Sequence, residues 1–156
     1  MSDLTHLGPD GRPRMVDVSA KQETDRRAVA AGFVRIDEAT LGLARTGLNA
    51  KGSVVQVAEL AGIMAAKRTH ELIPLCHQLP LSGISVSVDF EDGGLRVTAE
   101  ARTTARTGVE MEALCAVSVA CLTLYDMLKA KARGMTIERI QLLEKGGGAS
   151  GDWLRD

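Results

Sequence analysis

Aromatic residues are scarce in this sequence. They make up 3% of its 156 residues, with one Trp, one Tyr and two Phe. Proteins that bind single-stranded nucleic acid use aromatic side chains as stacking platforms for the bases. The scarcity argues against an RNA-binding domain, and it requires a hydrophobic core built mainly from Ala, Val, Leu, Ile and Met.

An excess of positive charge is absent as well. The chain has 19 Lys and Arg residues against 20 Asp and Glu residues, so its formal net charge is −1. A nucleic-acid-binding surface usually carries a marked basic excess, because it displaces the counterions of many phosphates. We therefore expect no nucleic-acid partner, and we expect any bound phosphate to be held locally by a few cations.

Cysteine and long apolar runs are also sparse. Cys76, Cys115 and Cys121 form no CxxC pair, which fits neither a disulfide framework nor a structural zinc site. No apolar run approaches the roughly 20 residues that span a bilayer. The polar start of the chain lacks the apolar segment of a signal peptide. These absences predict a cytoplasmic protein with reduced thiols and no membrane association.

The remaining composition is typical of one globular domain. Hydrophobic residues make up 45% of the chain and charged residues 25%, which suits a folded unit of this length. Gly8-Pro9-Asp10-Gly11 disfavours regular structure near the N-terminus. We therefore predict a flexible arm over residues 1–24, a single domain over residues 25–145 and a glycine-rich tail over residues 146–156.

A β-hairpin is the clearest structural prediction. Apolar and polar residues alternate over residues 84–90 and again over residues 95–99, and this period of two is typical of strands with one buried face. Glu91-Asp92-Gly93-Gly94 lies between the two segments and favours a turn. The two strands are therefore expected to pair in an antiparallel arrangement.

Two longer helices are predicted from apolar periodicity and capping residues. Ser53 can cap a helix that runs to about Arg68. Thr107 and Glu110 have capping-box spacing ahead of an Ala- and Leu-rich run. That run predicts a helix over about residues 109–132.

The other segments complete an order that points to a fold class. A strand is predicted over residues 27–36, a brief helix around residues 41–43, an irregular loop between Pro74 and Pro80, and a last strand over residues 137–143. The order is strand, helices, two strands, helix, strand. It favours a ferredoxin-like α+β sandwich, an antiparallel sheet packed against helices.

Charged residues on the long predicted helix are the first candidates for chemistry. Glu112 and Asp126 lie within about 40° of each other in projection but about 21 Å apart along the helix axis. Lys129 follows Asp126 by three residues, so these two can form an ion pair. One helix cannot bring Glu112 to that pair. Without further information, a solvated helix edge with an ordinary ion pair is the favoured explanation of the pattern.

The start of the same helix and the proline-bracketed loop hold further candidates. Glu110 and Glu112 can stabilise the positive end of the helix dipole, and Met111 between them suits a core position. His77 could serve as an acid or base near neutral pH. Cys76 has no visible activating neighbour. His70 is the only nearby second ligand, so no metal site is predicted.

Several lysines are candidate phosphate ligands. Lys51 and Lys145 adjoin glycine-containing loops, which can bind phosphates through their backbone amides. The segment after Lys145 could equally be a flexible tail. No GxxxxGK[ST] motif is present, so a nucleotide-binding P-loop is excluded.

Five sequence strings together resemble one known family over nearly the whole chain. They are Met15-Val16-Asp17-Val18-Ser19-Ala20-Lys21, Ala65-Ala66-Lys67-Arg68-Thr69, Leu72-Ile73-Pro74-Leu75-Cys76-His77, Thr107-Gly108-Val109-Glu110-Met111-Glu112-Ala113-Leu114 and Tyr125-Asp126-Met127. In this order they resemble the cyclic pyranopterin monophosphate synthase family, protein C of molybdenum cofactor biosynthesis (MoaC). The chain departs from the family pattern at Gln78, where proline is usual, and at Arg106, where lysine is common.

The resemblance implies an enzyme, a phosphorus–oxygen lyase. Its substrate would be (8S)-3',8-cyclo-7,8-dihydroguanosine 5'-triphosphate, converted to cyclic pyranopterin monophosphate with release of pyrophosphate. The family also implies a ferredoxin-like fold assembled as a homohexamer, a trimer of dimers with active sites at subunit interfaces. Residues that lie far apart on one helix could then meet through a neighbouring subunit. No cofactor is required, although Mg²⁺ could accompany the triphosphate.

The resemblance also implies roles for individual residues. Asp126 and Lys129 would carry acid and base steps with help from Lys51. His77 and Glu112 would position or protonate the base and sugar. Arg26, Lys67 and Lys145 would hold the triphosphate. The remaining substrate contacts implied by the family motifs are Leu75, Cys76, Glu110 and Met111.

Two other classes of function compete with this interpretation. A non-catalytic nucleotide- or pterin-binding module could use the same fold, since a fold alone does not define a function. The match at Lys51, Asp126 and Lys129 argues against it, because a binder needs no acid and base groups. An RNA-binding ferredoxin-like domain lacks both the aromatic residues and the basic excess.

Overall fold

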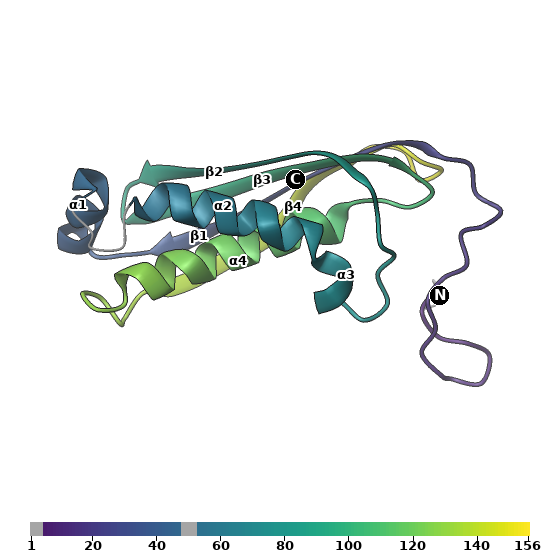
Figure 1. Cartoon of the computed structure of the whole chain (residues 1–156), viewed down its shortest axis with the longest axis horizontal. Helices are drawn as coiled ribbons and strands as arrows, with labels where there is room; N and C mark the ends of the chain where they lie inside the picture. Colours follow the sequence, from purple (N-terminus) through teal and green to yellow (C-terminus); the bar gives the residue numbers. More distant parts are fainter. Residues whose placement is uncertain (1–4, 48–52) are drawn as a thin grey trace.

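The computed structural model describes residues 5–47 and 53–156. Within these ranges the chain forms one antiparallel sheet and a layer of helices on one of its faces (Figure 1). The strands are β1 (Thr24–Arg35), β2 (Leu81–Glu91), β3 (Gly94–Ala105), β4 (Thr136–Gly146) and β5 (Trp153–Leu154), and the helices are α1 (Glu38–Thr46), α2 (Val54–Lys67), α3 (Thr69–Leu72) and α4 (Glu110–Leu128).

The sheet has the strand order β2-β3-β1-β4-β5 with antiparallel pairing throughout. Its first four strands show the β-α-β-β-α-β arrangement of ferredoxin-like folds, in which each half of the chain contributes a strand, a helix and a second strand. The predicted fold class is confirmed. The predicted hairpin is β2 and β3, in which Val88 pairs with Val97.

Small residues bring the helix layer close to the sheet. Ala28, Ala30 and Val34 of β1 are fully buried and belong to the core beneath α4. Their spacing of two places them on the same face of the strand. The core therefore lies between this face of the sheet and the two long helices. It is built mainly from aliphatic residues, as the low aromatic content predicted.

Helices α2 and α4 are in close contact at Gly62. A Cβ atom on Gly62 would lie 2.9 Å from the backbone oxygen of Ala116 and 3.2 Å from the Val86 side chain. Ala113, Ala116 and Ala120 of α4 are also fully buried. The position of α4, and with it the position of its N-terminal end, therefore depends on small residues at this contact.

Most predicted element types are confirmed, and one predicted cap is wrong. Ser53 caps α2, since its hydroxyl accepts the Gln56 amide at 3.4 Å. Thr107 was expected to cap the long helix, but α4 begins at Glu110 after Val109, with no side-chain cap. The helix also ends at Leu128 rather than near residue 132, because the chain turns there toward β4.

Helix α4 is more apolar than the sequence analysis indicated, which found no apolar run long enough to span a bilayer. By length and hydropathy it resembles a membrane-spanning helix, because its Ala, Cys, Ser and Thr residues interrupt the apolar pattern only weakly. It is nonetheless packed against α2, β1 and β3, and 56% of its most apolar window is buried within the protein. This packing is that of a core helix.

Both ends of the chain carry local structure. In the predicted arm, Leu7 and Pro13 form an isolated bridge, and the segment runs beyond the end of the sheet (Figure 1). The predicted tail contains β5, whose Trp153 pairs with Lys145 of β4, a strand that the sequence pattern did not indicate. At the opposite edge of the sheet, the Glu59 carboxylate of α2 accepts the Val88 amide of β2 at 3.1 Å.

We predict that Gly62→Ala destabilises the protein while Gly42→Ala does not. At Gly62 the new methyl group would push against backbone, and such overpacking costs about 1–3 kcal/mol. At Gly42 in α1 nothing lies within 4 Å of the added atom, so the higher helix propensity of Ala should stabilise by roughly 0.5–1 kcal/mol. Chemical denaturation of both variants measures the difference, and equal effects would contradict the role given to Gly62.

Candidate active site

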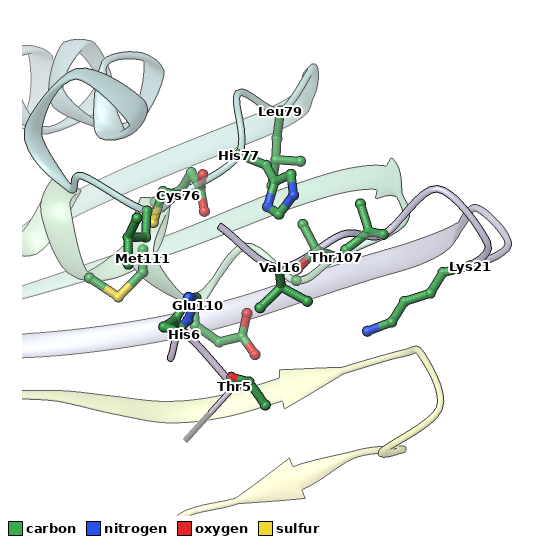
Figure 2. A pocket seen from close by; sticks show the side chains of 14 residues that line it. Thr5, His6, Val16, Lys21, Cys76, His77, Leu79, Thr107, Glu110 and Met111 are labelled. Carbon is green, nitrogen blue, oxygen red and sulfur yellow. The ribbon is translucent and has the colours of Figure 1, made fainter. Parts of the chain in front are cut away.

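A cavity of about 280 Å³ opens where β3 leads into α4. Its walls come from three parts of the chain: the N-terminal segment, the loop between α3 and β2, and the first turn of α4 (Figure 2). The lining residues are Thr5, His6, Val16, Val18, Lys21, Leu75, Cys76, His77, Leu79, Thr107, Gly108, Glu110, Met111 and Glu112.

The loop between α3 and β2 is irregular, as its prolines predicted, but it is anchored at both ends. At its start the Cys76 amide donates to the Ile73 oxygen at 3.2 Å. At its end the Thr103 hydroxyl of β3 donates to the Pro80 oxygen at 2.6 Å. These hydrogen bonds fix the backbone that carries Cys76 and His77 beside the start of α4.

Glu112 is the most unusual ionisable group in the cavity. Its side chain lies in the first turn of α4 and only 4% of the residue is exposed. Burial, together with the nearby Glu110 carboxylate, raises the pKa of Glu112 to about 7, against the lowering effect of a backbone hydrogen bond. A carboxyl group with this pKa can take up or release a proton near neutral pH.

Glu110 lies two residues before Glu112 and is paired with a cation from near the other end of the chain. Its Oε1 atom is 3.6 Å from the Nζ atom of Lys145 in β4. The two acidic residues therefore have different environments: Glu110 is half-exposed and paired with Lys145, whereas Glu112 is buried. Capping of the helix dipole, the alternative raised by the sequence, does not explain the burial of Glu112.

Met111, Cys76 and His77 complete the wall opposite the N-terminal segment (Figure 2). Met111 is half-buried and faces the cavity, so the expectation of a core position for it is wrong. Burial raises the pKa of the Cys76 thiol, with smaller contributions from Glu112 and Cys115. A thiol with a raised pKa is a poor nucleophile. Within the described residues, no group of His, Cys, Asp and Glu could hold a metal ion.

The N-terminal segment supplies cavity residues that sequence reasoning missed. Lys21 and His6 line the cavity, and the pKa of Asp17 is lowered chiefly by hydrogen bonds to Ser19 and slightly by His77. Asp17 and Lys21 belong to the first of the five family-like strings, which was the available signal for them. His6 lies before that string and had no comparable signal.

Other predicted site residues lie outside this cavity. Asp126 and Lys129 form the predicted ion pair, with 2.7 Å between Lys129 Nζ and Asp126 Oδ1, and both side chains are more than half exposed. The solvated helix edge therefore describes this end of α4 but not Glu112. Lys67 is exposed at the end of α2, and Lys51 lies outside the described residues.

Arg26 lies at a second, shallower pocket of about 410 Å³ near the start of β1. Its Nη1 atom donates to the Gly147 oxygen at 3.4 Å. Its Nε atom is buried and has no hydrogen-bond partner. Arg26 and Lys145 thus both contact the C-terminal glycine loop and lie at the same end of the sheet as the cavity.

The fold is ferredoxin-like, and its cavity holds a buried carboxyl group and a histidine, features typical of the active site of a small enzyme. Residues 15–148 match the sequence profile of the MoaC family, and the chain belongs to that family. The match includes every residue that lines the cavity except Thr5 and His6.

Three curated relatives match nearly the whole chain. The protein of Thermomicrobium roseum is 60% identical over 100% of this chain and 95% of its own length. That of Novosphingobium aromaticivorans is 55% identical over 98% of both chains. That of Brucella ovis is 56% identical over 96% of this chain and 92% of its own. Each relative is named cyclic pyranopterin monophosphate synthase.

We predict that Glu112 makes stability depend on pH. Because its pKa rises from 4.5 to about 7 on folding, the folded protein binds more protons than the unfolded chain between these values. The free energy of unfolding should therefore fall as the pH rises through this window, by about 3 kcal/mol for the single group. Denaturation of the wild type and Glu112→Gln at fixed protein concentration from pH 4.5 to 7.5 measures the effect. An unchanged difference between them across the window would contradict it.

Proposed function

We propose that this protein is a cyclic pyranopterin monophosphate synthase, a lyase of molybdenum cofactor biosynthesis. It converts (8S)-3',8-cyclo-7,8-dihydroguanosine 5'-triphosphate to cyclic pyranopterin monophosphate and releases pyrophosphate. The observation that carries the proposal is the cavity in which the buried Glu112 lies with His77, in a chain at least 55% identical to relatives with that name.

The cavity suits the proton transfers that the conversion needs. The five-membered ring of the dihydropurine must open and a pterin must form, which requires protons to be moved on and off nitrogen and oxygen atoms. Glu112 can serve as either acid or base, since the pKa of its carboxyl group is about 7. His77 would position or protonate the base and sugar from the facing loop. Leu75, Cys76 and Met111 provide the apolar walls against which the flat ring system would lie.

Asp126, Lys129 and Lys51 would supply the remaining acid and base groups from a second copy of the chain. Asp126 and Lys129 lie near the C-terminal end of α4, and the cavity lies at its N-terminal end. Fourteen residues of α-helix separate Glu112 from Asp126, a rise of about 21 Å. A complete site therefore requires two copies that place opposite ends of α4 together.

The outer face of α2 supports assembly into the proposed homohexamer, a trimer of dimers. Val57, Leu60 and Met64 recur at helical spacing on this face and are 39%, 58% and 52% exposed. Leu72 of α3 continues the apolar surface in sequence and is 54% exposed. Soluble proteins usually cover such surfaces with a partner, and a second copy of the chain would cover this one.

The triphosphate would bind to cations near the cavity mouth. Arg26 and Lys145 lie at the C-terminal glycine loop, and Lys67 would join them from a neighbouring subunit. Cations stabilise the charge that develops as pyrophosphate leaves.

The conversion changes no net oxidation state, so the proposal needs no redox cofactor. Mg²⁺ can accompany the triphosphate, and the protein acts in the cytoplasm.

The first experiment follows turnover directly. The purified protein is incubated with the cyclised dihydro-GTP, and release of pyrophosphate is measured together with the fluorescent oxidised pterin. Both products should form in equal amounts. Tight binding of the substrate without either product would replace the proposal with a non-catalytic nucleotide- or pterin-binding module.

We predict that Asp126→Asn abolishes turnover without affecting assembly. The substitution keeps the size of the side chain and removes the carboxylate that pairs with Lys129. Because the pair is exposed, the loss of stability should be within about 1 kcal/mol. Turnover assays and gel filtration measure the two effects, and wild-type rates in this variant would remove Asp126 from the mechanism.

We also predict that two inactive variants restore each other's activity when they assemble together. If each site takes Glu112 from one copy and Lys129 from another, coexpression of Glu112→Gln with Lys129→Ala gives intact sites in about one quarter of random pairings. Each variant alone should be inactive. Mixed oligomers, purified through two different tags, should therefore recover measurable turnover. Mixed oligomers that remain inactive would place the whole site within one subunit.

A further inference from the structure

The C-terminal hairpin lies mostly beyond the part of the chain that matches the family profile. The match ends at residue 148, whereas the hairpin runs from Gly146 to Arg155. Its return strand, β5, pairs with the end of β4. Arg155 fastens the strand further, since its amide donates to the Leu143 oxygen at 2.8 Å and its Nε atom to the Leu142 oxygen at 2.6 Å. The hairpin is thus an ordered structural element, held by hydrogen bonds to β4.

The hairpin holds the Lys145 ammonium group from one side. Lys145 Nζ donates to the Ser150 hydroxyl at 2.9 Å and lies 3.6 Å from Glu110 Oε1. A lysine has three donors on a flexible stem, so two partners on different elements determine where the charge points. In Figure 2 the C-terminal strands, drawn in yellow, pass beside the Glu110 side of the cavity.

The same hairpin holds the Arg26 guanidinium through its glycines. Gly147 and Gly148 have φ angles of 91° and 81°, which residues with a Cβ atom rarely adopt. A Cβ on Gly148 would overlap the Arg26 guanidinium. The Asp152 carboxylate accepts the Gly147 amide at 3.1 Å and so fixes the loop whose oxygen receives the Arg26 hydrogen bond.

We propose that Ser150 and Asp152 are positioning residues that aim Lys145 and Arg26 at the leaving pyrophosphate of the substrate. This inference rests on the proposed function, which supplies the anion. Ser150 acts on Lys145 directly, and Asp152 acts on Arg26 through the backbone of Gly147. The two cations, which belong to β4 and β1, are thereby oriented by one hairpin.

Ser150→Ala tests the first contact, with Ser150→Thr as the conservative variant and Leu154→Ala as a control in the same hairpin. Leu154 is 71% exposed and pairs with Glu144 rather than with Lys145. Loss of one orienting hydrogen bond should weaken binding about three- to tenfold. We expect Ser150→Ala to raise KM by that factor with little change in kcat, and to weaken binding of inorganic pyrophosphate equally by calorimetry. Ser150→Thr and Leu154→Ala should resemble the wild type.

Two substitutions of Asp152 distinguish its effect on the geometry of the loop from the effect of its charge on the anion. Asp152→Asn keeps an oxygen that can accept the Gly147 amide, whereas Asp152→Ala removes it. If Asp152 positions the loop, Asn should bind pyrophosphate as the wild type does and Ala should bind it several-fold more weakly. If Asn instead binds more tightly than the wild type, the carboxylate acts by repelling the anion and the positioning role is wrong.

Two further outcomes would overturn the inference. Equal KM and equal pyrophosphate affinity in Ser150→Ala and the wild type would show that Ser150 orients nothing. Equal losses in Ser150→Ala, Ser150→Thr and Leu154→Ala with a lower Tm would reduce the hairpin to a stabilising element. Because pyrophosphate binding is measured without turnover, the comparison remains decisive even if the wild type makes no pterin, a result that would contradict only the proposed function.

Discussion

The close contact of α4 with α2 and the sheet is the constraint on which the rest of the structure depends. At this contact Gly62 leaves no room for a side chain, and it lies against the backbone of Ala116 in α4. Such packing leaves the helix little freedom to slide or tilt. The first turn of α4 is therefore held at one place against the loop that carries His77, and the burial that raises the pKa of Glu112 follows from that placement.

The length of α4 divides the candidate site into two parts. Glu112 is buried near its beginning, whereas Asp126 and Lys129 lie exposed near its end. A partner that covered this ion pair would have to offset the cost of removing both charges from water. In the proposed assembly, this division would make turnover depend on contact between two copies of the chain.

The sequence predicted those features that depend on neighbouring residues. Period-two alternation located β2 and β3, and Ser53 marked the start of α2, because both signals arise within a few residues. The predicted cap at Thr107 was wrong, because the start of α4 is set by the path of the chain from β3 into the helix and not by a local sequence signal. The N-terminal wall with Lys21, the position of Met111 and the pairing of Lys145 with Glu110 all join distant segments. No local pattern encodes such contacts, and for Lys21 only the resemblance offered a signal.

The hydrogen bond from Val88 to Glu59 has a consequence for how molecules of this protein can associate. Strand β2 forms one edge of the sheet, and an unpaired edge invites the strand of another molecule to continue the ladder. Here the Glu59 carboxylate accepts the Val88 amide, in the second half of that edge strand. An incoming strand would have to displace a charged acceptor, so open-ended growth of sheets is discouraged even at the high concentrations reached during synthesis. The contacts proposed above for the outer face of α2 would avoid this edge.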